Sequence, residues 1–498
     1  MPPWRSRRSR SSARGRLLRE EAALDEHLDR HPVEVDGGVG DGSVGIGRVL
    51  RPGADLGADP VRRLLQFIER PALPSRDGLG EPVEGDWSSR LQVVRDVITH
   101  EDDGSAVAAW VACDPILARV EWPIVGPRAC LVGGAVRDAI LGVPHGPDVD
   151  VVVEGDAIAV ATRIGHDLGG RVITHERFRT ARVEFAHGRH LDLVSARRET
   201  YARPGALPDV SPGGLADDLA RRDFTVNAIA FVLHGDGAGE IIDPHGGRAD
   251  IRAERIRSLR ADAFHEDPSR VVRALRYAAR LGFRMEDGTE SAARRAATEV
   301  SLAHSRVADE LARLLAEDAA PVALAMGAAL GLAWPDADPR RADRLEALEL
   351  ALTRPGAPGV TPWALRLGLG IDPVAVEDAA LPAWSRAVAR EVRDGLERAP
   401  AVSAARRPSE VDDLLGDLPP AAQIGVLVGG AEAVATWWAR WRDLAPEVGG
   451  SDLVAAGVAP GPGIGRALRA VRRAVLDGRA TGRDEEMAVA LAEAGRSA

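Results

Sequence analysis

The sequence predicts an α+β protein in which a head of strands and helices precedes an all-helical neck, body and tail. Two observations predict this order. From about residue 115, short apolar runs alternate with stretches of helical period, which is the pattern of a mixed sheet covered by helices. After Asp250 strand-like runs stop, and Arg- and Ala-rich segments of helical period continue to the C-terminus. Pro- and Gly-rich breaks near residues 335, 355 and 400 separate these helices.

The same changes in character divide the chain into four segments. They are an N-terminal extension (1–112), the head (113–250), a helical neck (251–325) and a helical body and tail (326–498). The extension sustains no period, and its GxGxxG match at Gly40–Gly45 lacks the helix that a dinucleotide-binding turn requires, so we discard it. Residues 1–16 contain Arg and Ser but no acid, which fits a transit peptide, a disordered basic arm or a start codon placed too far upstream. We favour the last.

Composition excludes several kinds of chemistry. All 64 basic residues are arginine, so the chain has neither the lysine of a Walker A loop nor an amine for Schiff-base catalysis. A phosphate must therefore be held by arginine, by backbone N–H groups or by a metal ion. The net charge of −11 argues against a nucleic-acid partner, but residues 251–284 hold nine arginines and four acids, which makes a local basic patch.

Two features bear on location. The apolar run Ala319–Trp334 is shorter than the ~20 residues that span a bilayer and is interrupted by Pro and Gly, so we expect a buried helix and no membrane partner. Cys113 and Cys130 have no metal-ligand spacing and allow at most one disulfide, which fits a cytoplasmic protein. The sequence makes no prediction of the oligomeric state.

The head opens with a strand, a glycine turn and a helix. Ala129–Val132 is an apolar run that predicts a buried strand, and Gly133-Gly134 allows a sharp turn with close backbone approach. Val136–Leu141 predicts a short helix, with Arg137 in its first turn. The N–H groups at the start of such a helix are available to a phosphate. The alternative is a tight turn followed by a surface arginine.

Three aspartates lie on two of the strands that follow. Asp148 and Asp150 stand two residues apart in DVDVVV and therefore project from the same face. Two such carboxylates repel each other unless a cation or water screens them, and oxygen ligands suit Mg²⁺. The alternative for this pair is a solvated strand end. Asp192 lies opposite Leu191 and Leu193 in RHLDLVSA, and three carboxylates on adjacent strands would hold two metal ions for displacement at phosphorus.

The rest of the head and the start of the neck follow in order. We predict a helix over Ile158–Leu168, strands at 180–186 and 190–194, and a Pro/Gly-rich connection between Arg198 and Asp218. The connection is long, which favours a functional role. In EDPSR, Asp267 and Pro268 predict a helix start. That helix buries Val271, Val272, Leu275 and Ala279, while Arg273, Arg276 and Arg280 recur at spacings of three and four and line either a nucleotide or tRNA path or the solvated surface.

Five motifs in order carry a resemblance to a known family. They are LVGGAVRDAILG followed by DVD, RRDFTVNAIA (221–230), DPHGGRADI (243–251), EDPSRVVRALRYAARLGF (266–283) and the weaker SRVADELARLL (305–315). In order and spacing they resemble the class II tRNA nucleotidyltransferases and the related bacterial poly(A) polymerases. The resemblance covers about residues 130–310, does not reach 1–110 and is vague beyond about 330.

The resemblance implies a polymerase-β-like head and a role for each matching residue. The implied roles are metal binding for Asp148 and Asp150, with Asp192 as a third catalytic carboxylate; triphosphate binding for Gly133, Gly134, Arg137, Arg221 and Arg222; ribose binding for Asp223; and base reading for Asp267 and Arg270. A carboxylate accepts from the exocyclic amino group of C or A, and a guanidinium donates to a ring nitrogen or carbonyl. The cofactor that the resemblance implies is Mg²⁺.

The reaction implied by the resemblance is addition of C and A to the 3′ end of tRNA. The tRNA 3′ hydroxyl attacks the α-phosphate of CTP or ATP, and the helical body binds the tRNA acceptor arm. Open alternatives are an enzyme that adds only CC or only A, a poly(A) polymerase, a transferase acting on a small molecule, and a non-catalytic RNA- or nucleotide-binding protein. In the family, a flexible loop at 199–217 helps the pocket change from C to A. The lone His-Asp dipeptide, His166-Asp167, lies in the head, so we infer no C-terminal HD phosphohydrolase domain.

Overall fold

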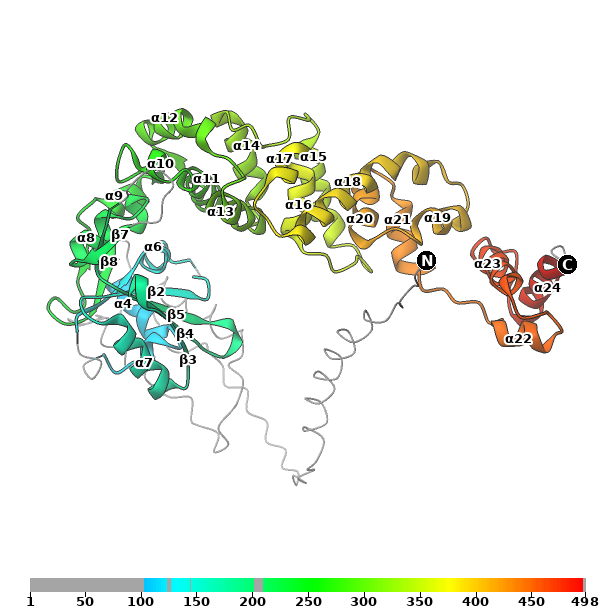
Figure 1. Ribbon diagram of the computed structural model, residues 1–498, viewed down its shortest axis with the longest axis horizontal. Helices are drawn as coiled ribbons and strands as arrows, with labels where there is room; N and C mark the ends of the chain where they lie inside the picture. Colours follow the sequence, from blue (N-terminus) through cyan, green and yellow to red (C-terminus); the bar gives the residue numbers. More distant parts are fainter. Residues whose placement is uncertain (1–102, 123–126, 144, 201–208, 496–498) are drawn as a thin grey trace, which may run out of the picture. The chain divides into compact units, whose positions relative to one another are not determined.

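The computed structural model describes residues 103–122, 127–143, 145–200 and 209–495 (Figure 1). The predictions for most of the N-terminal extension, including the Gly40–Gly45 match, lie outside these residues. So do 201–208 within the long connection of the head.

The head is built on a seven-stranded mixed sheet, as the sequence predicts. Its strand order is β3-β4-β5-β2-β1-β8-β9, and the strands are β1 (Ala129–Val132), β2 (Asp148–Val153), β3 (Arg171–His175), β4 (Thr180–Glu184), β5 (His190–Ser195), β8 (Ala230–His234) and β9 (Ile241–Ile242). β2 and β5 are parallel, and the other neighbouring strands are antiparallel. The three strands predicted at 129–132, around 180–186 and at 190–194 are confirmed.

Both faces of this sheet are covered because side chains alternate along each strand. One face carries Leu131, Val151 and Leu193 into the main core, beneath α6 (Gly134–Leu141) and α7 (Ala157–Leu168). The other face packs Val132 and Val152 against α8 (Leu215–Ala220) in a smaller core. The predicted helices at 136–141 and 158–168 are therefore present, each ended by a glycine in the left-handed region.

A helix within the predicted extension packs on the head. α4 (Asp103–Cys113) lies against α6, and Val107 and Trp110 join the main core. Asp103 accepts hydrogen bonds from Arg248 (2.5 Å) and Arg252 (2.6 Å) of α9 (Gly247–Arg252). These contacts group residues 103–112 with the head.

Two short strand pairs were not predicted. β6 (Arg197–Thr200) and β7 (Asp209–Pro212) form an antiparallel pair within the Pro/Gly-rich connection. After Asp250, where we expected no strand, β10 (Arg255–Ile256) pairs with β11 (Arg284–Met285) in parallel. That expectation was wrong because strands of two residues are too short to show a period of two, and parallel partners lie far apart in sequence.

The neck is helical and buries the face that the sequence indicates. Its helices are α10 (Ala263–Glu266), α11 (Ser269–Leu281), α12 (Asp287–Ala296), α13 (Ser305–Ala316) and α14 (Ala320–Leu330). Val271, Val272 and Leu275 of α11 are fully buried, although Ala278 takes the core position expected for Ala279. The apolar run from 319 forms α14, which is buried on one face only: Leu324 and Leu330 are buried, whereas Val322 is 55% exposed, so the expectation of a buried helix was wrong in part. No described helix is long and apolar enough to cross a membrane.

Ten further helices form the body and tail in the described chain. They are α15 (Arg341–Leu352), α16 (Pro362–Gly370), α17 (Pro373–Asp378), α18 (Ala383–Ala404), α19 (Pro408–Leu415), α20 (Pro420–Val428), α21 (Ala433–Thr436), α22 (Gly450–Ala455), α23 (Pro462–Leu476) and α24 (Arg483–Gly495). α18 and α20 touch backbone to backbone: a Cβ at Gly395 would lie 2.0 Å from the carbonyl oxygen of Ala422. The last three helices share a small core of their own.

Candidate active site

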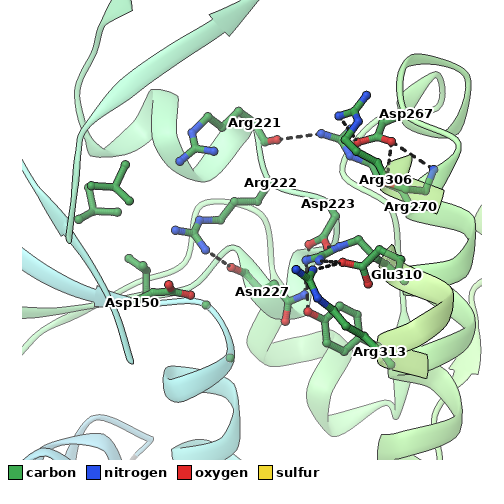
Figure 2. Close-up of a pocket in the computed structure, with 18 of the residues that line it drawn as sticks. Asp150, Arg221, Arg222, Asp223, Asn227, Asp267, Arg270, Arg306, Glu310 and Arg313 are labelled. Atoms are coloured by element: carbon green, nitrogen blue, oxygen red, sulfur yellow. Dashed lines mark hydrogen bonds and ion pairs between the residues drawn. The ribbon is translucent and has the colours of Figure 1, made fainter. Parts of the chain in front are cut away.

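A cavity of about 550 Å³ lies where the head sheet meets α11 and α13 (Figure 2). This volume is within the range of nucleotide-sized ligand pockets. Polar residues from four of the predicted motifs line it: Gly133, Gly134, Asp150, Arg221, Arg222, Asp223, Asn227, Asp267, Arg270, Arg273, Arg306, Asp309, Glu310 and Arg313. The motifs are up to 180 residues apart in sequence, so the fold alone brings them together.

The turn between β1 and α6 requires glycine at one position. Gly133 caps α6 with φ at +73°, a region that side-chain-bearing residues rarely adopt. A Cβ there would lie 2.9 Å from Nη1 of Arg222 and 3.6 Å from Oδ2 of Asp150. The turn therefore brings bare backbone between an arginine and a carboxylate of the cavity, close to where a phosphate would be held.

The predicted carboxylates lie on adjacent parallel strands. The register of β2 and β5 places Asp148 beside His190 and Asp150 beside Asp192. Nε2 of His190 is 2.9 Å from Oδ1 of Asp148 and 3.8 Å from Oδ2 of Asp192. Asp150 is reached by solvent through the cavity but is otherwise surrounded by protein, and this burial, together with the negative charge of Asp192, raises its pKa against the opposing effect of Arg222.

The carboxylate of Asp192 is already paired with an arginine. Arg182, its cross-strand neighbour on β4, donates from Nε to Oδ1 (2.8 Å) and from Nη2 to Oδ2 (2.7 Å). Asp192 does not line the cavity. In the described parts of the chain, no three His, Cys, Asp or Glu side chains are grouped closely enough to hold a metal ion. Asp148 and Asp150 remain as two carboxylates on one strand face, and the pKa of Asp150 is raised. Such a pair fits a Mg²⁺ ion that takes its other ligands from water and from substrate phosphates.

A buried carboxylate that sequence reasoning missed holds the two adjacent arginines. Asp218 is fully buried in α8. Its Oδ1 accepts from Nη2 of Arg221 at 2.5 Å, and its Oδ2 accepts from Nη2 of Arg222 at 3.1 Å. Arg222 also donates to the carbonyl oxygen of Asn227 (3.4 Å). Both predicted phosphate-binding arginines line the cavity, and Asp218 holds both of them. Spacings of three and four residues on a helix were the available signal.

Asp223 lies at the centre of a hydrogen-bond network beneath the cavity. Its Oδ1 accepts from the backbone N–H of Phe224 (2.8 Å) and from Nδ2 of Asn227 (3.1 Å), and its Oδ2 accepts from Nε of Arg273 (2.7 Å). Burial alone would raise the pKa of Asp223, but Arg273 and the hydrogen bonds outweigh it and lower the pKa to about 2. The carboxylate is therefore ionised, with room for one further donor such as a ribose hydroxyl.

Arg137 lies beneath the cavity wall, away from the triphosphate-binding position we predicted. Its side chain is completely buried and is not part of the lining. It donates from Nε to Asp138 (2.8 Å) and from Nη1 to Oδ1 of Asn227 (2.6 Å). His145 links the other oxygen of Asp138 (2.7 Å) to the carbonyl oxygen of Asp148 (2.6 Å). Arg137 thus supports the site instead of contacting a ligand, because its side chain is completely buried and pairs with Asp138.

The two predicted base-reading residues line one end of the cavity. Oδ1 of Asp267 accepts from the backbone N–H and the hydroxyl of Ser269. The predicted helix start was one residue early: α11 begins at Ser269, and its N-cap is Pro268, not Asp267. Nη2 of Arg270 donates to the carbonyl oxygen of Arg221 (3.3 Å; Figure 2). Nη1 of Arg270 is buried and makes no hydrogen bond within the described residues, so it is a donor available to a ligand.

The three arginines expected along a nucleotide or tRNA path are largely neutralised. Arg273 pairs with Asp223 and Glu310, and Arg276 pairs with Glu317 (2.8 Å). Arg280 lies 3.7 Å from Glu317. Only Arg273 of the three lines the cavity. Their acidic partners are Asp223, Glu310 of α13 and Glu317, the residue after that helix, and helical spacing within α11 could not reveal them.

The three arginines of α11, together with Arg137, surround one aromatic ring. The guanidinium carbons of Arg137, Arg273, Arg276 and Arg280 lie 4.6–5.4 Å from the ring centre of Tyr277. Tyr277 lines the cavity. Stacking and cation–π contacts of this kind fix the positions of the arginines.

Helix α13 contributes a side of the cavity to which we gave no role. Arg306, Asp309, Glu310 and Arg313 line it. They recur at spacings of three and four in the fifth motif, so the signal was present but was interpreted only as part of a resemblance. Arg306 donates from Nη1 to Oδ2 of Asp267 at 2.9 Å (Figure 2).

Comparisons with known proteins agree with the motifs. A family model described as the poly A polymerase head domain matches residues 129–257. A CC-adding tRNA nucleotidyltransferase of Deinococcus radiodurans is 36% identical over 366 residues, 72% of this chain and 87% of that protein. An A-adding tRNA nucleotidyltransferase of Halalkalibacterium halodurans is 43% identical over 199 residues, 39% of this chain. The chain spans 46%, 24% and 20% of the length of the three A-adding relatives it matches.

A solved structure supports the fold. The Thermotoga maritima CCA-adding enzyme complexed with tRNA aligns with a TM-score of 0.63 over 78% of this chain and 98% of that one, at 24% identity. That identity is low enough for the likeness to concern the fold alone. The Deinococcus relative covers most of both chains, and on that evidence this protein belongs to the tRNA nucleotidyltransferase family, with a poly(A) polymerase-type head.

Proposed function

We propose that the protein adds C and A residues to the 3′ end of tRNA without a template, using CTP and ATP and releasing pyrophosphate. One observation carries the proposal. A single cavity is lined by a carboxylate of the DVD strand, by two anchored arginines and by an acid–arginine pair suited to the edge of C or A. These are a metal ligand, a phosphate grip and a base reader in one space.

The metal ion and the triphosphate have separate binding residues in this proposal. Mg²⁺, when bound at Asp148 and Asp150, would neutralise phosphate charge and favour attack of the 3′ oxygen on the α-phosphate. Arg221 and Arg222 hold the triphosphate, and Gly133 and Gly134 present backbone beside it.

The remaining residues position sugar, base and carboxylates. Asp223 accepts from the ribose, while Asp267 accepts from the base amino group and Arg270 donates to the ring. Asp192 supports the two metal ligands through the neighbouring strand and His190. Catalysis then consists of positioning and charge neutralisation.

The tRNA acceptor arm is the proposed macromolecular partner. The helical body and tail provide a long surface that suits recognition of an RNA helix by its backbone and shape. We place the reaction in the cytoplasm, as the cysteine pattern predicts.

A second candidate function is one half of this reaction, the addition of only CC or only A. Three relatives at 40–45% identity are named A-adding, and a relative that spans 72% of this chain is named CC-adding. Two others at 41% identity are named multifunctional CCA proteins. In either case the same residues act, but the cavity accepts only one base. Two enzymes would then share the work in the cell.

A primer assay tests both candidates. tRNA transcripts that end before the tail, after C and after CC are each incubated with Mg²⁺ and with CTP, ATP or both. Addition of three nucleotides followed by a stop supports complete CCA addition. Addition of C only, or of A only to the CC-ended transcript, supports the second candidate. Long A tracts on unrelated RNA would indicate a poly(A) polymerase, and no incorporation by folded protein would refute the proposal.

A further inference from the structure

The carboxylate of Asp267 is held from two sides by different parts of the chain. Its Oδ1 accepts from the N–H (3.1 Å) and the hydroxyl (2.6 Å) of Ser269, two residues away. Its Oδ2 accepts from Nη1 of Arg306, 39 residues away on α13. The local turn therefore fixes one oxygen, and Arg306 holds the other. The plane of the carboxylate depends on that ion pair.

The pair also separates two hollows. Asp267 and Arg306 line the main cavity on one side and a smaller hollow of about 350 Å³ on the other. The side chain of Arg306 is 36% exposed, whereas that of Asp267 is 13% exposed. The arginine thus lies at the partition, partly exposed, while its backbone is held because Val307 and Ala308 are buried in the core.

Arg270, the other base-reading residue, is held differently. It is 7% exposed. Nη2 donates to the carbonyl oxygen of Arg221, and Nη1 is buried without a hydrogen bond in the described chain and lies 3.8 Å from Oε2 of Glu266. Its position depends on burial and on these two contacts, neither of which comes from α13. The two halves of the base reader are therefore set by separate contacts and can be perturbed separately.

The chemistry of the bases gives the ion pair a consequence. Cytosine and adenine present an amino donor where uracil and guanine present a carbonyl oxygen. A carboxylate held in the right plane accepts from the amino group and repels the oxygen, but a carboxylate that rotates freely discriminates less well.

We propose that Arg306 is a positioning residue for base selection. It holds the carboxylate of Asp267 in the orientation that accepts a hydrogen bond from the amino group of C or A. This proposal rests on the proposed nucleotide-adding function and deepens it. Arg306 does not contact the reacting atoms. Its loss therefore affects which nucleotide is chosen more than the rate at which a correct nucleotide is added.

The test compares CTP with UTP. Incorporation onto a transcript that ends before the tail is measured for kcat and KM, and binding of CTP and UTP is measured at equilibrium. Arg306→Ala is expected to lower the CTP-to-UTP ratio of kcat/KM about tenfold, the scale of one charge-assisted hydrogen bond, with most of the change in KM. Arg306→Lys, which keeps a charged donor, is expected to restore most of the ratio.

Two controls separate positioning from loss of charge or fold. Arg313→Ala removes an arginine from the same helix and the same cavity, one that pairs with Glu310 (2.6 Å) and not with Asp267. It should leave the CTP-to-UTP ratio unchanged. In an Asp267→Ala background, Arg306→Ala should have no further effect on the ratio, because the residue through which it acts is gone.

The outcomes distinguish this proposal from the one on which it rests. An equal fall in kcat/KM for CTP and UTP, or no change, would overturn the role of Arg306 while leaving nucleotide addition intact. If the wild-type protein binds CTP but incorporates nothing, the proposed function fails, and the binding ratio still decides the role of Arg306. Wild-type protein that binds CTP no better than UTP would overturn both.

Discussion

Replacing Asp218 by Asn keeps the shape of the side chain and removes the charge that anchors Arg221 and Arg222. Asp218 is fully buried, and each of its oxygens serves one arginine. Removing one partner of a buried ion pair costs about 3–5 kcal/mol. Because the side chains of both arginines keep 16–19% exposure and can turn toward water, we expect a loss near the lower end, about 3 kcal/mol.

The functional effect follows from the displaced guanidinium groups. A shift of roughly 1 Å in a positioning group can lower a rate about a hundredfold, so Asp218→Asn should raise the KM for CTP and ATP at least about tenfold. The assay is incorporation at varied nucleotide concentration, with the thermal midpoint measured in parallel.

Asp217→Asn is the matched control. Asp217 lies next to Asp218 on the same helix and pairs with Arg198 at 3.0 Å, but its side chain is 32% exposed. A partly exposed pair of this kind contributes about 1 kcal/mol or less, and Asp217 does not line the cavity. Wild-type KM and thermal midpoint for Asp218→Asn, or equal effects of the two substitutions, would refute the anchoring role.

Three further predictions concern the turn, the acid network and the body. Gly133→Ala should raise the KM for nucleotides, because its Cβ would lie 2.9 Å from Nη1 of Arg222 in a backbone region costing about 1–2 kcal/mol; a wild-type nucleotide titration would contradict this. The lowered pKa of Asp223 means that it contributes stability above its unfolded pKa of about 3.9 and loses it as pH falls toward 2. Acid titration of unfolding should show a loss of about 2 kcal/mol between roughly pH 5 and 2 that is absent in Asp223→Asn, and identical acid curves would count against it. Gly395→Ala should unfold the body at lower temperature by forcing a Cβ to 2.0 Å from the Ala422 carbonyl oxygen, seen as early protease cleavage; unchanged cleavage would exclude that close contact.

The sequence was sufficient where a short-range pattern determines the geometry. Asp148 and Asp150 share a face because strand side chains alternate. Gly133 was identified because a strand, a turn and a helix follow within a few residues. Local rules of this kind need no knowledge of distant contacts.

The sequence was insufficient where a partner comes from elsewhere in the chain. Arg137 was predicted to bind the triphosphate from the first turn of a helix, with a surface arginine as the alternative, yet it is fully buried against Asn227, 90 residues away. The arginines of α11 resembled a basic path until Glu310 and Glu317 were placed beside them. Charge spacing along one helix does not reveal the charges of the helix that packs against it.

The central claim is that the cavity adds nucleotides to the 3′ end of tRNA through the carboxylates of β2. The most direct measurement is a single-turnover reaction of wild-type and Asp150→Ala protein on CC-ended tRNA with ATP and Mg²⁺, with ATP binding measured in the same samples. The account predicts one added A for the wild type, and retained folding and ATP binding without detectable addition for the variant. Addition by the variant at the wild-type rate would contradict the account.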